Sequence, residues 1–206
     1  MAYPVTVGVE PPKTARDRLT VAFRIILAIP HLLLVGGIGV SLVARSGWGV
    51  GTEGGLLGAV VGFLAIVSWV TIVLGGTHIA GIREFSRFFL RWRVRALAYT
   101  MLLEDRYPPF GDGPYPTSCE VVDPAGPRDR VSVGFRLILA IPHFVALFFI
   151  TLAWAMTAFI AWLLILVTGE YPKGLYDFGV GALRWHIRVE AYLLLLVDDY
   201  PPFSLE

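Results

Sequence analysis

Leu27-Ala28-Ile29-Pro30-His31 occurs a second time in the chain, 112 positions later, as Leu139-Ala140-Ile141-Pro142-His143. Two neighbouring motifs repeat at the same offset, Arg16-Asp17-Arg18 with Arg128-Asp129-Arg130 and Phe23-Arg24 with Phe135-Arg136. Several motifs related by one offset indicate an internal duplication. We therefore divide the chain into copy one, residues 1–110, and copy two, residues 111–206.

The later parts of the two copies repeat at a shorter offset. Motifs related by 93 positions are Trp69 with Trp162, Arg91-Trp92 with Arg184-Trp185, and Tyr107-Pro108-Pro109-Phe110 with Tyr200-Pro201-Pro202-Phe203. Because the two offsets differ by 19 residues, copy one carries an insertion of that length between His31 and Trp69. A glycine-rich loop over residues 44–55 lies in this interval.

The composition is typical of a membrane protein. Of the 206 residues, 56% are hydrophobic and 16% are charged, and the mean hydropathy is +0.68. Soluble domains have about 45–50% apolar and about 25% charged residues. The low charge excludes disorder, and the single cysteine, Cys119, excludes a disulfide-scaffolded secreted domain. A net charge of +1 argues against a nucleic-acid partner.

The apolar stretches predict four membrane spans. Copy one has two candidates, near residues 21–43 and 56–76, because a span needs about 20 apolar residues. Copy two has one apolar tract, near 134–169, which is too long for one upright span and short for two. We predict an all-α integral membrane protein with a transmembrane helical hairpin in each copy. A single span in copy two is the alternative.

The placement of lysine and arginine favours the hairpins, since cytoplasmic loops carry the excess of positive charge. With two spans per copy, 16 of the 17 lysines and arginines fall on one side, and only Arg45 falls on the other. The sequence thus predicts a multi-pass plasma-membrane protein with cytoplasmic termini. An even number of spans per copy relates the copies by an axis along the membrane normal.

A basic amphipathic helix is expected after each apolar part, near residues 80–103 and 180–197. In the first, arginines at four-residue intervals form a stripe flanked by aromatic residues. Such a helix lies in the lipid headgroup layer, although packing on the hairpin of its own copy is an equal alternative. The predicted lipid-contacting residues are Arg83, Arg87, Arg91, Arg95, Trp92, Arg184, Trp185 and Arg188.

Two further arginines, Arg24 and Arg136, precede the prolines of the Pro-His motifs by about one and a half turns. We predict that they reach the lipid headgroups, because charges at membrane depth are costly. The alternative is an ion pair with Asp17 or Asp129 of the same helix.

Short cytoplasmic β segments are predicted by alternating residues at Tyr3–Val9 and at 115–122. Pairing of Tyr3–Val9 with Cys119–Val122 would clamp the two copies together.

His31 and His143 follow a proline at equivalent positions. Two symmetry-related histidines in a four-helix bundle can ligate one haem iron, whereas the alternative is a structural hydrogen bond near the proline. No metal site is predicted at His78 or His186, because no carboxylate or cysteine lies at ligand spacing. No catalytic residue is predicted either, since hydrolase and phosphate-binding motifs are absent from the sequence.

The order of these motifs resembles the bacterial membrane-protein family called domain of unknown function 4389, in two tandem copies. The shared features are Ala-Ile-Pro-His, a Trp-bearing apolar tract, the turn Gly169-Glu170-Tyr171-Pro172-Lys173-Gly174, Arg-Trp and Tyr-Pro-Pro-Phe. Copy one has Gly76-Thr77-His78-Ile79-Ala80-Gly81 instead of this turn, which implies that only copy two retains the role of the turn. The resemblance implies a bacterial plasma-membrane protein and carries over no catalytic residue, since the family has no agreed activity.

Three functions are compatible with these patterns. The first is a non-enzymatic accessory or scaffold subunit of a larger plasma-membrane complex, with membrane lipids and other membrane-protein subunits as partners. The second is a lipid- or quinone-binding carrier whose groove between the copies is lined by His31, His143, Arg24 and Arg136. The third is a haem redox module that uses both histidines.

Overall fold

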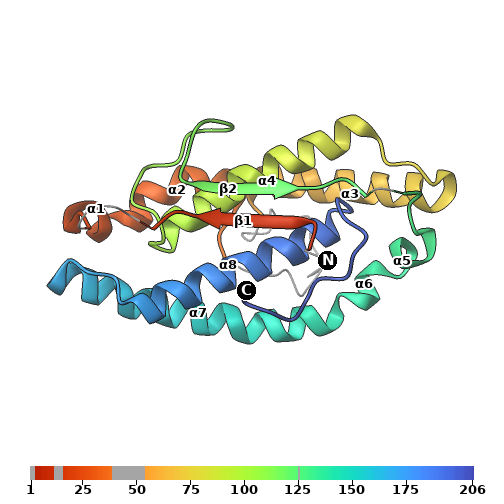
Figure 1. Ribbon diagram of the computed structural model, residues 1–206. Helices are drawn as coiled ribbons and strands as arrows, with labels where there is room; N and C mark the ends of the chain where they lie inside the picture. The colour runs from red at the N-terminus through yellow and green to blue at the C-terminus, as the bar shows by residue number, and fades with distance from the viewer. Residues whose placement is uncertain (1–2, 12–15, 39–53, 125) are drawn as a thin grey trace.

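The computed structural model describes residues 3–11, 16–38, 54–124 and 126–206, and the described part is mostly helical (Figure 1). Its elements, in chain order, are β1 (Val5–Val9), α1 (Arg18–Ala22), α2 (Arg24–Val35), α3 (Gly55–Gly75), α4 (Ala80–Thr100), β2 (Thr117–Val121), α5 (Arg130–Gly134), α6 (Arg136–Leu139), α7 (Ile141–Thr168) and α8 (Lys173–Leu193). Each copy therefore contains a strand, a short helix, a long apolar helix in two pieces and a return helix. We call α4 and α8 the return helices.

The apolar tract of copy two forms one helix through its whole length. Helix α7 runs without interruption over 28 residues, which corresponds to about 42 Å. The hairpin predicted near 134–169 is therefore wrong. The physical reason lies in the sequence from 143 to 168, which contains no glycine or proline that would break or turn the helix.

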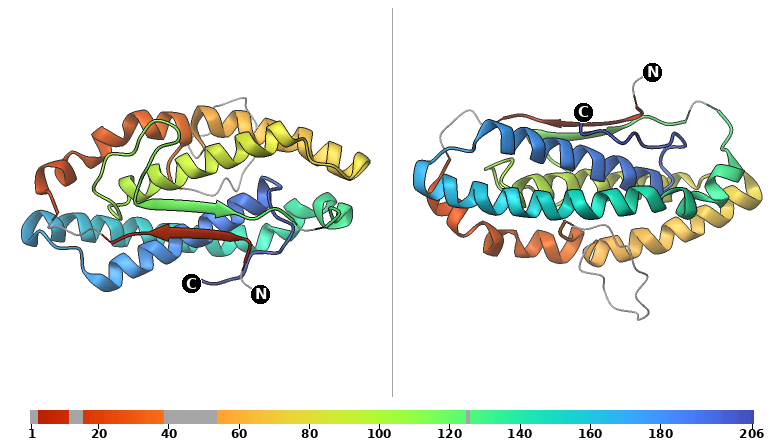
Figure 2. Two further views of the ribbon diagram at one scale, coloured as in Figure 1. Left: turned by 45° about the horizontal axis from the view of Figure 1, so that its top comes forward. Right: turned by 90° about the horizontal axis from the view of Figure 1, so that it is seen from below.

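In copy one, α2 and α3 follow one another end to end in the same direction (Figure 2). The start of α3 packs on the end of α2, since a Cβ built on Gly55 would lie 2.6 Å from the carbonyl carbon of Leu34. Together they correspond to α6 and α7, and the insertion separates the two halves. The spans predicted near 21–43 and 56–76 thus correspond to two helices that lie end to end rather than to two arms of a hairpin. Residues 39–53, including most of the predicted loop 44–55, lie outside the described part.

The two copies are related by a pseudo-two-fold axis and run antiparallel. Helix α1 packs on α7, and its counterpart α5 packs on α3. Strands β1 and β2 pair antiparallel with Val7 opposite Cys119, which confirms the predicted pairing. Each strand packs on the return helix of the other copy, β1 on α8 and β2 on α4. The sheet therefore joins the two copies.

The long helices end in equivalent ways. Gly76 and Gly169 cap α3 and α7 in the left-handed conformation, with φ of 73° and 82°. Cβ atoms built on these glycines would lie 2.5 Å from the Arg130 guanidinium and 3.3 Å from that of Arg18. Each arginine thus lies at the C-terminus of the other copy's long helix, where the helix dipole favours a cation.

Tryptophans of the long helices join the copies in the same equivalent manner. The indole of Trp69 donates a hydrogen bond to the Val133 carbonyl, and that of Trp162 donates to the Val21 carbonyl, both at 3.0 Å. These bonds link each long helix to the short helix of the other copy.

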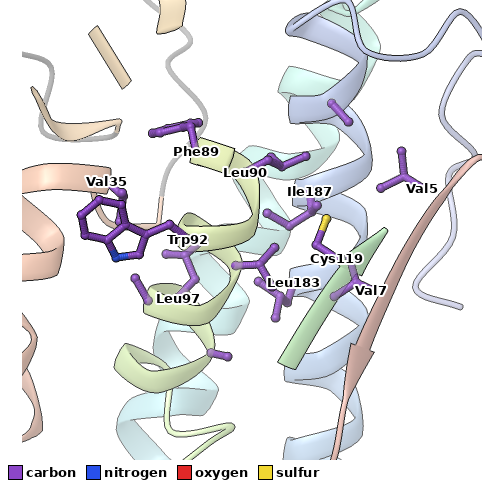
Figure 3. Packing of buried hydrophobic residues seen from close by; sticks show 14 of the residues in the cluster. Val5, Val7, Val35, Phe89, Leu90, Trp92, Leu97, Cys119, Leu183 and Ile187 are labelled. Atoms are coloured by element: carbon purple, nitrogen blue, oxygen red, sulfur yellow. The ribbon is translucent and has the colours of Figure 1, made fainter. Parts of the chain in front are cut away.

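The return helices occupy the middle of the molecule, between the sheet and the long helices (Figure 2). Leu90 of α4, Leu183 and Ile187 of α8 and Cys119 of β2 gather in the core (Figure 3). Burial raises the pKa of the Cys119 thiol to about 12. The thiol is therefore protonated at neutral pH, as expected for a structural cysteine.

Candidate functional site

Arg24 and Arg136 are buried ion-pair residues, with only 1% of each exposed. Arg24 Nη2 donates to Asp105 Oδ1 at 2.7 Å, and Arg136 Nη2 donates to Asp198 Oδ1 at 3.0 Å. Each guanidinium also lies 4.2 Å from the centre of a tyrosine ring, Tyr99 or Tyr192. The structure therefore corrects the prediction that these two arginines reach lipid headgroups.

Each of these carboxylates holds two arginines. Arg16 lies 2.8 Å from Asp105, and Arg128 lies 3.0 Å from Asp198. Asp17 and Asp129, the ion-pair partners considered from the sequence, cap the N-termini of α1 and α5 instead. The arginines therefore pair with residues from the far end of their own copy, which fixes the start of the long helix to the end of the return helix.

Unusual backbone geometry places these carboxylates. Leu102 and Leu195, which follow the return helices, have φ of 65° and 61°. This left-handed conformation costs a leucine about 1–2 kcal/mol, and glycine usually occupies such a helix end. Both leucine side chains are buried, which offsets the strain. The next residues then present the Glu104 and Val197 carbonyls, and each accepts a 2.8 Å hydrogen bond from Arg24 or Arg136.

His31 lies in a buried aromatic cluster built from copy one alone. The indole of Trp92 donates to His31 Nδ1 at 2.9 Å, and the Phe110 ring stacks on the imidazole at 4.5 Å. Tyr107 completes the cluster, with its ring 5.0 Å from the imidazole.

His143 has the equivalent cluster in copy two. Trp185 donates to His143 Nδ1 at 3.2 Å, Phe203 stacks at 4.0 Å, and Tyr200 lies at 4.8 Å. The Pro-His, Arg-Trp and Tyr-Pro-Pro-Phe motifs thus meet in space in each copy. Trp92 and Trp185 are only 7% exposed, so they pack in the interior and are not the lipid-facing residues that we expected.

The two histidine clusters share no residue. Each imidazole accepts a hydrogen bond at Nδ1, and a neutral imidazole in that arrangement carries its proton on Nε2. A metal ligand presents a lone pair, so haem ligation through Nε2 would require these bonds to change. The four residues expected to line one groove between the copies lie in two separate places. His31 and Arg24 contact copy one, whereas His143 and Arg136 contact copy two.

The arginine stripe of α4 binds acidic residues at the start of copy two, on either side of β2. Arg91 Nη2 lies 2.8 Å from Asp112, and Arg95 lies 3.7 Å from the same carboxylate. Arg87 and Arg83 lie 2.6 and 3.4 Å from Asp123. The predicted headgroup-binding cations therefore have protein partners.

The arginines of α8 also bind protein groups. Arg184 donates to the Val7 carbonyl of β1 at 3.2 Å, and Arg188 donates to the Ser204 and Glu206 carbonyls. The amphipathic helices predicted near 80–103 and 180–197 exist as α4 and α8. They are covered by the sheet on one side and by the long helices on the other.

Among the buried positions at which the return helices differ is one where copy one has Arg93 and copy two has His186. Arg93 Nε donates to Glu190 Oε2 at 2.8 Å, and its Nη groups donate to the Val35 and Gly37 carbonyls. This pair links the copies, and sequence reasoning did not predict it. The available signal was a charged residue on the apolar side of α4, at a position where copy two has a histidine.

His186 is a buried histidine with protein partners on both ring nitrogens. Its Nδ1 lies 2.7 Å from the Ala182 carbonyl oxygen, and its Nε2 lies 2.7 Å from Thr151 Oγ1. Burial lowers the pKa of His186 to about 4, with nearby Arg93 acting in the same direction. The folded protein therefore keeps this imidazole neutral at pH values where the unfolded chain protonates it.

We expect the stability contributed by His186 to be lost as the pH falls from about 6.5 to about 4. In this range the unfolded chain binds a proton that the native state does not, which lowers the free energy of unfolding by about 1.4 kcal/mol per pH unit. Denaturant unfolding of the wild type and of His186→Gln between pH 4 and 7 measures the effect. If the difference in free energy of unfolding between wild type and variant did not change with pH, the expectation would be wrong.

The long helices expose an extensive apolar surface. We use the name apolar face for the exposed large apolar side chains of α1, α2, α3, α5, α6 and α7. The most exposed of them are Leu19, Ile25, Ile26, Leu33, Phe63, Ile66, Leu74, Val131, Leu137, Ile138, Phe149, Met156, Phe159 and Val167. Two of these helices, Gly55–Gly75 and Ile141–Thr168, are long and apolar enough to cross a membrane by length and composition.

Within the described ranges, no group of three or more His, Cys, Asp or Glu residues is placed to hold a metal ion. The buried polar side chains discussed above have protein partners, and their arrangement fastens helix ends and copies to one another. The apolar face takes no part in these internal contacts, so it is the candidate surface for binding something outside the chain.

Comparison with known proteins agrees with the duplication. No curated protein and no solved structure matches the chain. A family model described as Domain of unknown function (DUF4389) matches residues 54–111 and 130–204, which is more than half of the chain. The first match begins just before α3, and the ends of the two matches are related by the same 93 positions as the motifs. The chain therefore belongs to the DUF4389 family, as two tandem copies.

Proposed function

We propose that the protein is a non-enzymatic accessory or scaffold subunit of a larger complex in the bacterial plasma membrane, held there by the apolar face. The apolar face is the observation that carries the proposal. Phe63 on α3 and Phe149 on α7 are 66% and 63% exposed. Contiguous exposed apolar surface of this kind marks a membrane or protein contact.

The polar residues support a scaffold rather than an enzyme. The arginines that suggested a ligand site are engaged in ion pairs and carbonyl hydrogen bonds that hold the fold together. On the other side of the molecule, the sheet presents the polar side chains of Thr6, Ser118 and Glu120 outward. We propose this outer side of the sheet as the surface for protein partners.

Purification from native membranes into lipid nanodiscs tests the proposal. We expect the protein to stay with the membrane during an alkaline carbonate wash and to run in a native gel as a complex larger than the monomer. The double variant Ser118→Arg, Glu120→Arg should lose the partner and keep membrane binding. Lys173→Ala, which changes an exposed residue away from the sheet, is the matched control. Release by carbonate, or a free monomer from native membranes, would overturn the proposal.

A further inference from the structure

We infer that the protein lies flat in one leaflet of the membrane, with the long helices parallel to the membrane plane and the sheet facing water. The inference rests on the proposed membrane function and adds its orientation. It replaces spans that cross the bilayer with helices that lie within one half of it.

The first observation is that α7 exposes one side only. Its exposed residues, among them Val145, Leu152, Phe159 and Val167, recur at helical spacing. The opposite side, with His143, Trp154 and Ile165, is buried in the protein. All the exposed residues between Ile141 and Val167 are apolar. Helix α7 therefore presents a continuous apolar strip along its length.

The second observation is where the polar groups lie along the length of the long helices. The contacts of His186 with Thr151 and with Trp154 place the middle of α8 beside the middle of α7. The bonds from Trp92 and Trp185 reach His31 and His143 near the start of the long helices. Arg91 and Arg184 adjoin these tryptophans and bind Asp112 and the β1 backbone. Figure 1 shows the sheet beside the middle of the molecule, with its strands running along the helix direction.

An upright orientation conflicts with this arrangement. It would place the sheet, with Thr6, Ser118 and Glu120 facing outward, at the centre of the hydrocarbon layer. Open sheet edges exposed to lipid do not occur there, because each unpaired backbone group costs several kcal/mol. A charged side chain at the centre adds about 2.5–3.5 kcal/mol. The cost of placing Glu120 and the Arg91–Asp112 pair at the centre of the bilayer therefore opposes an upright orientation.

The flat orientation removes this conflict. A helix is about 10 Å thick, so the apolar face fits within one half of a hydrocarbon core of about 30 Å. The sheet and the paired arginines of α4 then face water. The pseudo-two-fold axis passes through the sheet, so it is directed along the membrane normal and both copies enter the leaflet to the same depth.

Lipid, rather than a second copy of the chain, is the occupant of the apolar face. The face follows both long helices, and α7 alone is about 42 Å long. A protein interface has a polar rim that fixes its partner, whereas acyl chains require none. The exposed strip of α7 offers no polar side chain for such a rim.

Two equivalent glycines allow a direct test. Gly81 and Gly174 begin the return helices at opposite ends of the molecule, and a Cβ built on either meets nothing within 4 Å. We place single cysteines there, as Gly81→Cys and Gly174→Cys, in a Cys119→Ala background. Thr6→Cys reports on the sheet and Met156→Cys on the apolar face. The probe is a membrane-impermeant maleimide added to sealed vesicles of known orientation that hold the purified protein without a partner.

We expect Gly81→Cys, Gly174→Cys and Thr6→Cys to react from the same side, and Met156→Cys to react only after denaturation. Reaction of the two glycine positions from opposite sides, or protection of Thr6→Cys, would overturn the inference in favour of an upright protein. Protection of Met156→Cys in an oligomer that persists without lipid would overturn it in favour of a second copy. Absence from the membrane fraction would instead overturn the proposed function, so the two failures are distinguishable.

Discussion

Replacing Asp105 by asparagine is expected to lower the free energy of unfolding by about 3 kcal/mol, within the range for a broken buried ion pair. The carboxylate lies 2.8 Å from Arg16 and 2.7 Å from Arg24. Arg24 is 1% exposed, so without the carboxylate its charge stays buried with only carbonyl oxygens and a tyrosine ring nearby. Denaturant unfolding in detergent or nanodiscs measures the change. Asp198→Asn in copy two should have a similar effect, because Arg136 has the same environment.

Asp112→Asn is the matched control for this prediction. Asp112 also binds two arginines, Arg91 and Arg95, but its side chain is 47% exposed. Solvent-exposed ion pairs contribute about 0–1 kcal/mol. If Asp105→Asn destabilised the protein no more than Asp112→Asn, the buried arginine clusters would not be fastening the helices as we describe.

Replacing Trp154 by alanine is expected to cost about 3–5 kcal/mol, the range for removing a buried aromatic side chain. Trp154 is the largest fully buried side chain in the described part of the chain. It lies between α7 and α8, with its ring 5.5 Å from that of His186. The substitution leaves a cavity between these helices, and unfolding measurements in lipid nanodiscs report its cost.

Phe159→Ala on the same helix is the comparison. Phe159 is 60% exposed on the apolar face, so its removal opens no internal cavity. We expect a change below about 1 kcal/mol, as for surface positions elsewhere. Equal losses for the two variants would contradict the assignment of a buried and an exposed side to α7.

The repeat predicted the order of the helices and strands, because motifs at equivalent positions form equivalent elements in both copies. Both strands pair as the alternating residues indicated, with Val7 opposite Cys119. The apolar lengths, in contrast, did not distinguish a hairpin from one long helix. Copy one is interrupted by the insertion and copy two is not, yet α2 and α3 lie end to end in copy one where copy two has α6 and α7. In the flat orientation that we propose, bilayer thickness does not limit the length of a helix, whereas the count of spans assumed that it does.

The charged residues were predicted less well, because their partners lie far away in the chain. Arg24 binds Asp105 across 81 positions, and no local spacing rule reaches that far. The stripe on α4 looked like a lipid-binding surface because its partners, Asp112 and Asp123, lie outside the helix, at the start of copy two. The histidine clusters were more accessible to prediction. Pro-His, Arg-Trp and Tyr-Pro-Pro-Phe are all repeated together, which is consistent with motifs that meet in space.

Membrane depth along α7 tests the flat orientation most directly. Spin labels on cysteines introduced at Val145, Leu152, Phe159 and Val167, all exposed on the apolar face, report depth from their collisions with oxygen and with a water-soluble nickel complex. We predict the same depth at all four positions. A profile that is deepest near Leu152 and Phe159 and shallow at Val145 and Val167 would show that the helix crosses the bilayer and would contradict the account.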